Sequence, residues 1–248
     1  MIVSTPHVAK PFIKLPPETF HRPEPMTKRV SKAFRRVGKI IQKLRAIYPK
    51  PKTALDFGTP HQLMVGTILS AQCTDVRVNQ VTPALFSKYP TVESFARAKQ
   101  EELEVDIRPT GFFRNKAKSI IGNAQALLER HNGTVPKTIE ELTALPGVGR
   151  KTANCVLGAV YGINSGIVVD THVIRLSQRL GLSRNANPEK IERDLMMIVP
   201  QHDWYDFSNL LILHGREICG ARKPECPSCS LRRICPSAEP MMRKFWKN

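Results

Sequence analysis

The stretch that decides the fold is Leu145-Pro146-Gly147-Val148-Gly149-Arg150-Lys151, which lies between two segments with helically spaced apolar residues. The proline ends the first segment, and the two glycines allow a tight turn free of side chains. We therefore expect the backbone N–H groups of Gly147, Val148 and Gly149 to be exposed at the start of a helix, a geometry that binds anions such as a DNA phosphate. This pattern is typical of a helix-hairpin-helix, and the alternative is an ordinary corner between two helices.

The composition favours a polyanionic partner. The chain has 248 residues, 38 of them Lys or Arg and 21 Asp or Glu, with a formal net charge of +17. This excess indicates nucleic acid or an anionic membrane surface, and it favours the DNA-binding interpretation of the hairpin. A hydrophobic content of 41% excludes a wholly disordered chain, and no stretch approaches the ~18 apolar residues that cross a bilayer. Because only 6% of residues are aromatic, base stacking is not the expected main binding mode.

Much of the positive charge lies near the N-terminus. Residues 1–52 contain 13 basic and two acidic residues. Residues 1–27 are rich in proline and have no periodic apolar pattern, so we expect a flexible basic tail there. No apolar segment of a secretory signal follows the start, and a transit peptide is the weaker alternative.

Beyond this tail, apolar residues recur at helical spacing. The clearest amphipathic stripe runs through residues 113–128 and ends at Asn132-Gly133. Strand-like alternation is nearly absent, so the expected fold class is all-α. A strand competes only at Ile167-Val168-Val169, which is short enough to be a buried loop.

Four cysteines near the C-terminus can surround one metal centre. Cys219, Cys226, Cys229 and Cys235 have the spacing C-x6-C-x2-C-x5-C. Structural zinc usually takes two well-separated C-x2-C pairs, whereas a [4Fe–4S] cluster accepts thiolates from one compact loop. The spacing favours the cluster over zinc, and disulfides rank third because nothing marks the chain as exported. The basic residues around these cysteines form either a solvated face or a metal-folded loop that contacts phosphate.

Lys151 and Asp170 are the candidate catalytic pair. Lys151 lies in the expected first turn of a helix, where the helix dipole disfavours a cation. The dipole and an expected partial burial both favour a neutral, nucleophilic amine, although a surface lysine is the simpler alternative. Asp170 fits a helix N-cap, which would leave one carboxylate oxygen free for chemistry. We expect His172 to be structural rather than a base.

Together, the hairpin with its lysine, the downstream aspartate and the cysteine loop resemble the endonuclease III family over about residues 30–236. The resemblance implies a DNA glycosylase with abasic-site lyase activity and a [4Fe–4S] cluster. It also implies two helical domains. A six-helix barrel with the helix-hairpin-helix would span residues 53–163, and a cluster domain would combine residues 28–52 with 164–236. Residues 237–248 would form a C-terminal tail.

The resemblance further implies which residues contact DNA. Gln72 would enter the gap left by an extruded nucleotide, and Phe112 would wedge into the duplex while Phe113 packs in the core. Hairpin contacts are expected from Gly147, Val148, Gly149 and Arg150. The implied partner is duplex DNA with oxidised pyrimidines or abasic sites, bound by a monomer without membrane contact. The implied location is a bacterial or archaeal cytoplasm, or the nucleus or mitochondrion of a eukaryote. The alternatives are a mismatch-directed glycosylase of the same superfamily and a non-catalytic DNA-binding scaffold.

Overall fold

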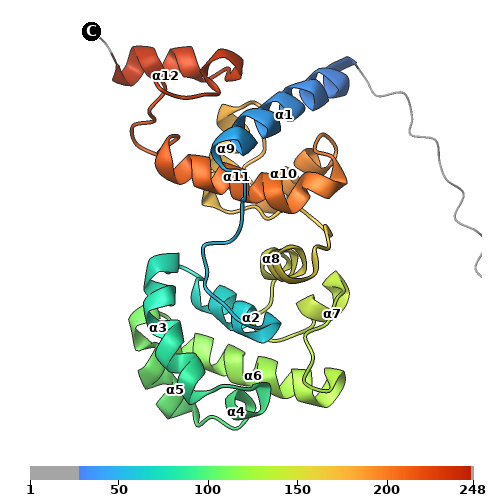
Figure 1. Cartoon of the computed structure of the whole chain (residues 1–248), viewed down its shortest axis with the longest axis vertical. Coiled ribbons are helices and arrows are strands. Elements are labelled where there is room, and N and C mark those ends of the chain that lie inside the picture. The colour runs from blue at the N-terminus through green and yellow to red at the C-terminus, as the bar shows by residue number, and fades with distance from the viewer. Residues whose placement is uncertain (1–27, 247–248) are drawn as a thin grey trace, which may run out of the picture.

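The computed structural model describes residues 28–246, so the basic tail expected at residues 1–27 lies outside the described range. Within that range the chain is helical and contains no strand, which confirms the expected all-α fold (Figure 1). Ile167-Val168-Val169 is a buried loop, as expected. The α-helices are α1 (Lys28–Ile47), α2 (Pro60–Leu69), α3 (Asp75–Lys88), α4 (Val92–Ala96), α5 (Gln100–Ile107), α6 (Phe113–His131), α7 (Ile139–Thr143), α8 (Arg150–Tyr161), α9 (Thr171–Arg179), α10 (Pro188–Met196), α11 (Trp204–Glu217) and α12 (Ala238–Phe245). Three short 3-10 helices are η1 (Arg108–Thr110), η2 (Gln201–Asp203) and η3 (Arg232–Ile234).

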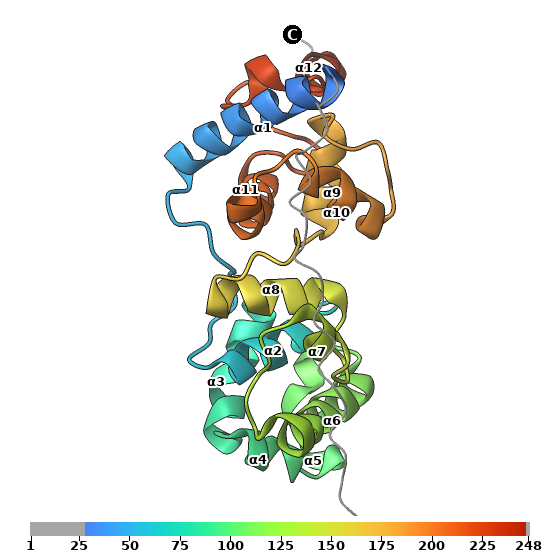
Figure 2. The same cartoon turned by 90° about the vertical axis from the view of Figure 1, so that its right-hand side faces the viewer.

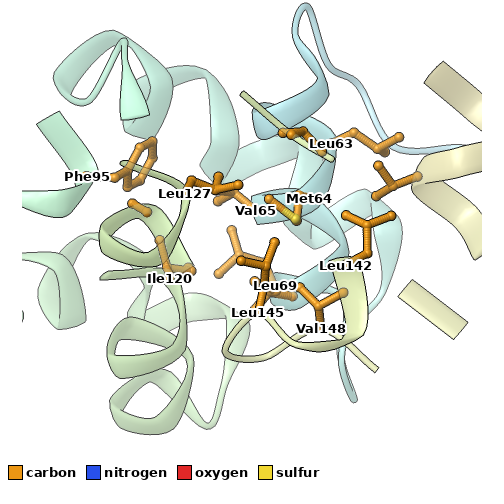
Figure 3. Packing of buried hydrophobic residues seen from close by; sticks show 14 of the residues in the cluster. Leu63, Met64, Val65, Leu69, Phe95, Ile120, Leu127, Leu142, Leu145 and Val148 are labelled. Carbon is orange, nitrogen blue, oxygen red and sulfur yellow. The ribbon is translucent and has the colours of Figure 1, made fainter. Parts of the chain in front are cut away.

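Helices α2 to α8 enclose one hydrophobic core. The stripe expected on α6 is buried through Ala117, Ile120, Ala124 and Leu127, all fully inaccessible to solvent. Their spacing of three and four residues places them on one face of the helix. Side chains from α2 and from the hairpin segment meet α6 in this core, among them Leu63, Met64, Leu145 and Val148 (Figure 3).

A second, separate core joins the two ends of the described chain. Ile40 and Leu44 of α1 are fully buried together with Leu176 of α9, Leu195 of α10 and Phe207 of α11. Helix α1 lies against α11 in both views, although about 160 residues separate them in sequence (Figures 1 and 2). We interpret the two cores as two domains and retain the expected boundaries, near residues 53 and 163, as a proposal.

Polar contacts connect the two groups of helices, and α8 lies at their boundary (Figure 2). The Arg216 guanidinium of α11 forms an ion pair with the Asp75 carboxylate at the start of α3. The Tyr205 hydroxyl accepts a hydrogen bond from the backbone N–H of Thr53 at 3.2 Å. A Cβ at Gly158 would lie 2.3 Å from the Tyr205 ring, so α8 and α11 approach closely there.

The segment expected as a C-terminal tail instead contains helix α12. The Trp246 indole N–H after this helix donates a hydrogen bond to the Pro224 carbonyl at 3.0 Å, and the Lys223 ammonium lies 4.0 Å from the centre of the Trp246 ring. These contacts attach the last described residue to the cysteine loop. None of the helices between residues 28 and 246 has the length and apolar character needed to cross a membrane.

Candidate active site

The hairpin turn forms between α7 and α8. Gly147 has φ +75°, and a Cβ there would lie 2.7 Å from the Ser119 Cβ, so the turn requires glycine. The Val148 N–H donates to the Leu145 carbonyl at 3.2 Å, and its side chain is buried. Our expectation of an exposed Val148 N–H is therefore wrong, because the turn itself uses this group. The N–H groups of Gly147 and Gly149 have no hydrogen bond within residues 28–246 and remain the candidates for a phosphate contact.

Lys151 is the second residue of α8 and follows this turn directly. Its side chain is exposed, so the expected partial burial is wrong. The cause is the turn, which places the first residues of α8 on the surface while Ala153 begins the buried face. The position of Lys151 at a helix N-terminus is as expected.

Asp170 caps α9 with both oxygens engaged. Its Oδ1 accepts from the N–H groups of His172 and Val173, each at 2.8 Å, and its Oδ2 accepts from His172 Nδ1 at 2.9 Å. The N-cap expectation is confirmed. The expectation of an oxygen without a partner is wrong, because the His172 ring folds back onto the carboxylate.

The surroundings of Asp170 favour its charged form. Burial opposes ionisation, but the hydrogen bonds from His172 and Val173 outweigh it, and the pKa of the carboxyl falls below its ordinary value. The positive charge of Lys151 also lowers this pKa, so the amine and the carboxylate lie within electrostatic reach of each other. The charges of the exposed Lys151 on α8 and of Asp170, the N-cap of α9, therefore act on each other.

No sequence pattern predicts the contacts of Arg150. Its Nε–H donates to Glu192 Oε2 at 2.8 Å, and the Asn154 side-chain amide donates to Glu192 Oε1 at 2.9 Å. Glu192 belongs to α10 and is only 6% exposed. The ion pair therefore ties the start of α8 to the other group of helices, next to Lys151. Arg150, which we expected to contact DNA, has this partner in the structure.

Gln72 and Phe112 project from two neighbouring turns. Both have left-handed backbone conformations, with φ 52° and φ 49°. Phe112 is 62% exposed, whereas Phe113 is half-buried and packs against the first core, as expected. The groove lined by Gln72 and Phe112 also includes Gly147 of the hairpin. An exposed phenylalanine beside a candidate phosphate-binding turn is suited to unstacking bases.

Cys219, Cys226, Cys229 and Cys235 line one pocket together with the apolar side chains of Leu176, Leu180 and Leu231. All four are free thiols. Burial, together with the nearby charges of the other three cysteines, raises the pKa of the Cys229 thiol to about 11. Within residues 28–246, no three His, Cys, Asp or Glu side chains converge closely enough to hold a single metal ion.

Two arginines of α9 support the first turn of the cysteine loop. The Arg179 Nη1–H groups contact the Cys219 sulfur at 3.3 Å and the Gly220 carbonyl at 2.8 Å. The Arg175 Nε–H donates to the Cys219 carbonyl at 3.1 Å. Four thiols in one apolar pocket, with a guanidinium donor on one sulfur, match the donor set and surroundings of an iron–sulfur cluster.

Comparisons with known proteins show the family of this chain. Residues 65–201 match the family described as "HhH-GPD superfamily base excision DNA repair protein". The chain is 51% identical to an endonuclease III from Synechocystis sp. over 214 residues, which cover 86% of this chain and 98% of that protein. Among solved structures, a non-covalent endonuclease III–DNA complex has a TM-score of 0.80 at 40% identity, covering 85% of this chain and 98% of its own. A trapped endonuclease III–DNA covalent intermediate has the same TM-score and identity, covering 85% and 99%. The chain therefore belongs to the endonuclease III family of base excision DNA repair enzymes, which are DNA glycosylases with abasic-site lyase activity.

Proposed function

We propose that Lys151 is the nucleophile and Asp170 its electrostatic partner in the removal of oxidised pyrimidines from duplex DNA. The observation that carries the proposal is an exposed amine, directly after the hairpin turn, whose charge acts on a partly buried carboxylate with hydrogen bonds to both oxygens. The family resemblance supports the substrate class.

The chemistry follows from these two groups. The exposed N–H groups of Gly147 and Gly149 bind a phosphate, and the damaged nucleotide is rotated out of the duplex. Asp170 stabilises the positive charge that develops at the sugar C1′. After the Lys151 ammonium has given up a proton to water, its nitrogen forms a bond to C1′ as the glycosidic bond breaks, and the base leaves with the bonding electrons and takes up a proton.

The same covalent link then permits strand cleavage. Loss of a proton from the amine and opening of the sugar ring give a Schiff base between Lys151 and C1′. Removal of a C2′ proton eliminates the 3′ phosphate and cuts the strand, and water releases the lysine. A solved relative trapped as a covalent DNA intermediate supports a covalent route.

The four cysteines are proposed to hold a [4Fe–4S] cluster. Cys219, Cys226, Cys229 and Cys235 would each supply one thiolate, and the bound cluster would fix the fold of the loop. The basic side chains of this loop would then be held where they can meet DNA phosphates. If the purified protein is colourless and contains stoichiometric zinc, the four cysteines bind zinc and the cluster assignment is wrong.

The proposed partner is double-stranded DNA with damaged bases or abasic sites, bound by a monomer. The proposed location is the bacterial or archaeal cytoplasm, at the nucleoid, with the nucleus or mitochondrion as the eukaryotic equivalents. Bacterial relatives support the first of these.

Borohydride trapping on duplex DNA with an abasic site tests the proposal. The unmodified chain should form a covalent adduct, and Lys151→Ala should abolish it, a loss of at least about 10³-fold. Lys190→Ala is the matched control, because Lys190 is an exposed lysine in the first turn of α10. An adduct that persists in Lys151→Ala would leave only a DNA-binding scaffold. Faster base release from G·T duplexes than from thymine glycol would instead indicate a mismatch-directed glycosylase.

A further inference from the structure

Lys116 lies in the first turn of α6 and is only 5% exposed. Its ammonium donates hydrogen bonds to the Leu69 carbonyl at 2.7 Å and to the Thr110 carbonyl at 2.8 Å. Leu69 is the last residue of α2, and Thr110 is the last residue of η1. One buried cation therefore joins the carboxyl ends of two helical segments that are far apart in sequence.

Hydrogen bonding explains why a charge is tolerated there. Carbonyl groups at helix ends carry partial negative charge and lack partners within their own helix. Burial lowers the pKa of the Lys116 ammonium, as it does for any buried amine. An apolar residue at this position would leave both carbonyls without this donor.

The two turns held by Lys116 carry the exposed tips Gln72 and Phe112. Gln72 lies three residues after Leu69, and Phe112 lies two residues after Thr110. Both have positive φ, which non-glycine residues adopt only when the surrounding structure holds them. Both tips line the same groove as Lys116.

We propose that Lys116 is a positioning residue that sets the spacing between Gln72 and Phe112, so that both enter the duplex at one lesion. The inference rests on the proposed function. Lys116 itself touches neither the sugar nor the base. Its loss would shift the tips relative to the hairpin while leaving Lys151 and Asp170 in place. The loss of activity would therefore appear only on duplex DNA, in which base pairs have to be separated.

The test compares one lesion in two settings. Single-turnover borohydride trapping is measured on an abasic site in duplex DNA and on the same site in a single strand. Lys116→Met should slow trapping on the duplex roughly 10- to 100-fold, because small misplacements of binding groups have effects of this size. Trapping on the single strand should be unchanged, since that DNA has no paired bases to separate.

Three further single variants and one double variant make the result specific. Phe112→Ala should show the same duplex-only loss, and combining it with Lys116→Met should add little, as expected for residues that act together. Lys116→Gln keeps an N–H donor without the charge and should give a smaller duplex-only loss, which also covers the case in which Lys116→Met does not fold. Lys99→Met removes an exposed lysine, 78% accessible at its side chain, and should change neither rate.

The outcomes distinguish failure of the positioning role of Lys116 from failure of the proposed function. Equal losses on both substrates in Lys116→Met and Lys116→Gln would make Lys116 a purely structural residue and overturn the inference alone. An unchanged duplex rate would overturn it as well. A wild-type chain that forms no adduct on either substrate would overturn the proposed function together with the inference.

Discussion

The two groups of helices contribute opposite kinds of side chain to the candidate site. Helices α2 to α8 present exposed groups on tight turns: Lys151 after the hairpin, and Gln72 and Phe112 on their two turns. The other group contributes Asp170, a partly buried carboxylate with hydrogen bonds to both oxygens, and the four thiols of one pocket. In the proposed function, the first group supplies the nucleophile and the residues that enter the duplex, whereas the second supplies the fixed negative charge. Because of this difference, we expect substitutions in the two groups of helices to impair the protein in different ways.

The largest effect is expected from the fixed charge. Asp170→Asn retains the N-cap hydrogen bonds of α9 but loses the anion. Base release should fall about 10²- to 10³-fold, the usual cost of removing an electrostatic contact made in the transition state. Single-turnover assays on thymine glycol duplexes measure this loss.

A separate control measures the effect of losing a helix N-cap without losing the Asp170 charge. Asn187→Ala removes a comparable cap from α10, where Asn187 accepts from the Lys190 N–H. It should lower the free energy of unfolding by about 1 kcal/mol and leave base release unchanged. Wild-type activity in Asp170→Asn would contradict the electrostatic role.

A substitution in the cysteine loop should lower the stability of the fold rather than the rate of the chemical step. Cys229→Ser removes one of the four proposed cluster ligands from the second group of helices. We expect loss of iron and visible colour, and a loss of about 4 kcal/mol or more in unfolding free energy, as for other lost metal sites. Cys73→Ser is the matched control, because Cys73 is a partly buried thiol outside the pocket. Equal iron content in the two variants would contradict the ligand assignment.

A buried histidine makes the first core sensitive to acid. His61 is 6% exposed and packs edge-on against the Phe95 ring. Burial lowers its pKa from 6.5 to about 4. The unfolded chain therefore binds more protons between these values, so stability is full above pH 6.5 and falls as the pH drops towards 4. The loss is on the order of 3 kcal/mol at pH 4.

Urea unfolding at pH 7 and pH 4.5 measures this dependence. His61→Phe keeps an aromatic ring without a titrating group and should show a smaller difference between the two pH values. His202→Gln is the control, because the His202 side chain is 80% exposed. Identical pH dependence in His61→Phe and the wild type would rule out His61 as the source.

The sequence predicted the features that depend on local pattern. Apolar spacing identified the buried face of α6, and the glycines and proline of residues 145–151 identified the hairpin. The same reasoning missed Glu192 and the His172–Asp170 contact, and it placed Lys151 too deep. Polar contacts such as Arg150–Glu192 join residues 42 positions apart and follow no period. Only the packed structure brings these side chains together.

The smallest effect is expected where the two groups of helices are tied together. Glu192→Gln removes the negative partner of Arg150 while keeping an amide that can hydrogen bond to Asn154. The start of α8 should then be held less firmly, and kcat should fall about 10-fold through misplacement of Lys151. The KM for duplex should stay constant or decrease, because the released guanidinium can bind phosphate. Glu189→Gln, an exposed carboxylate on the same helix, is the control. A higher KM with unchanged kcat in Glu192→Gln would show that the ion pair supports DNA binding rather than the position of the nucleophile.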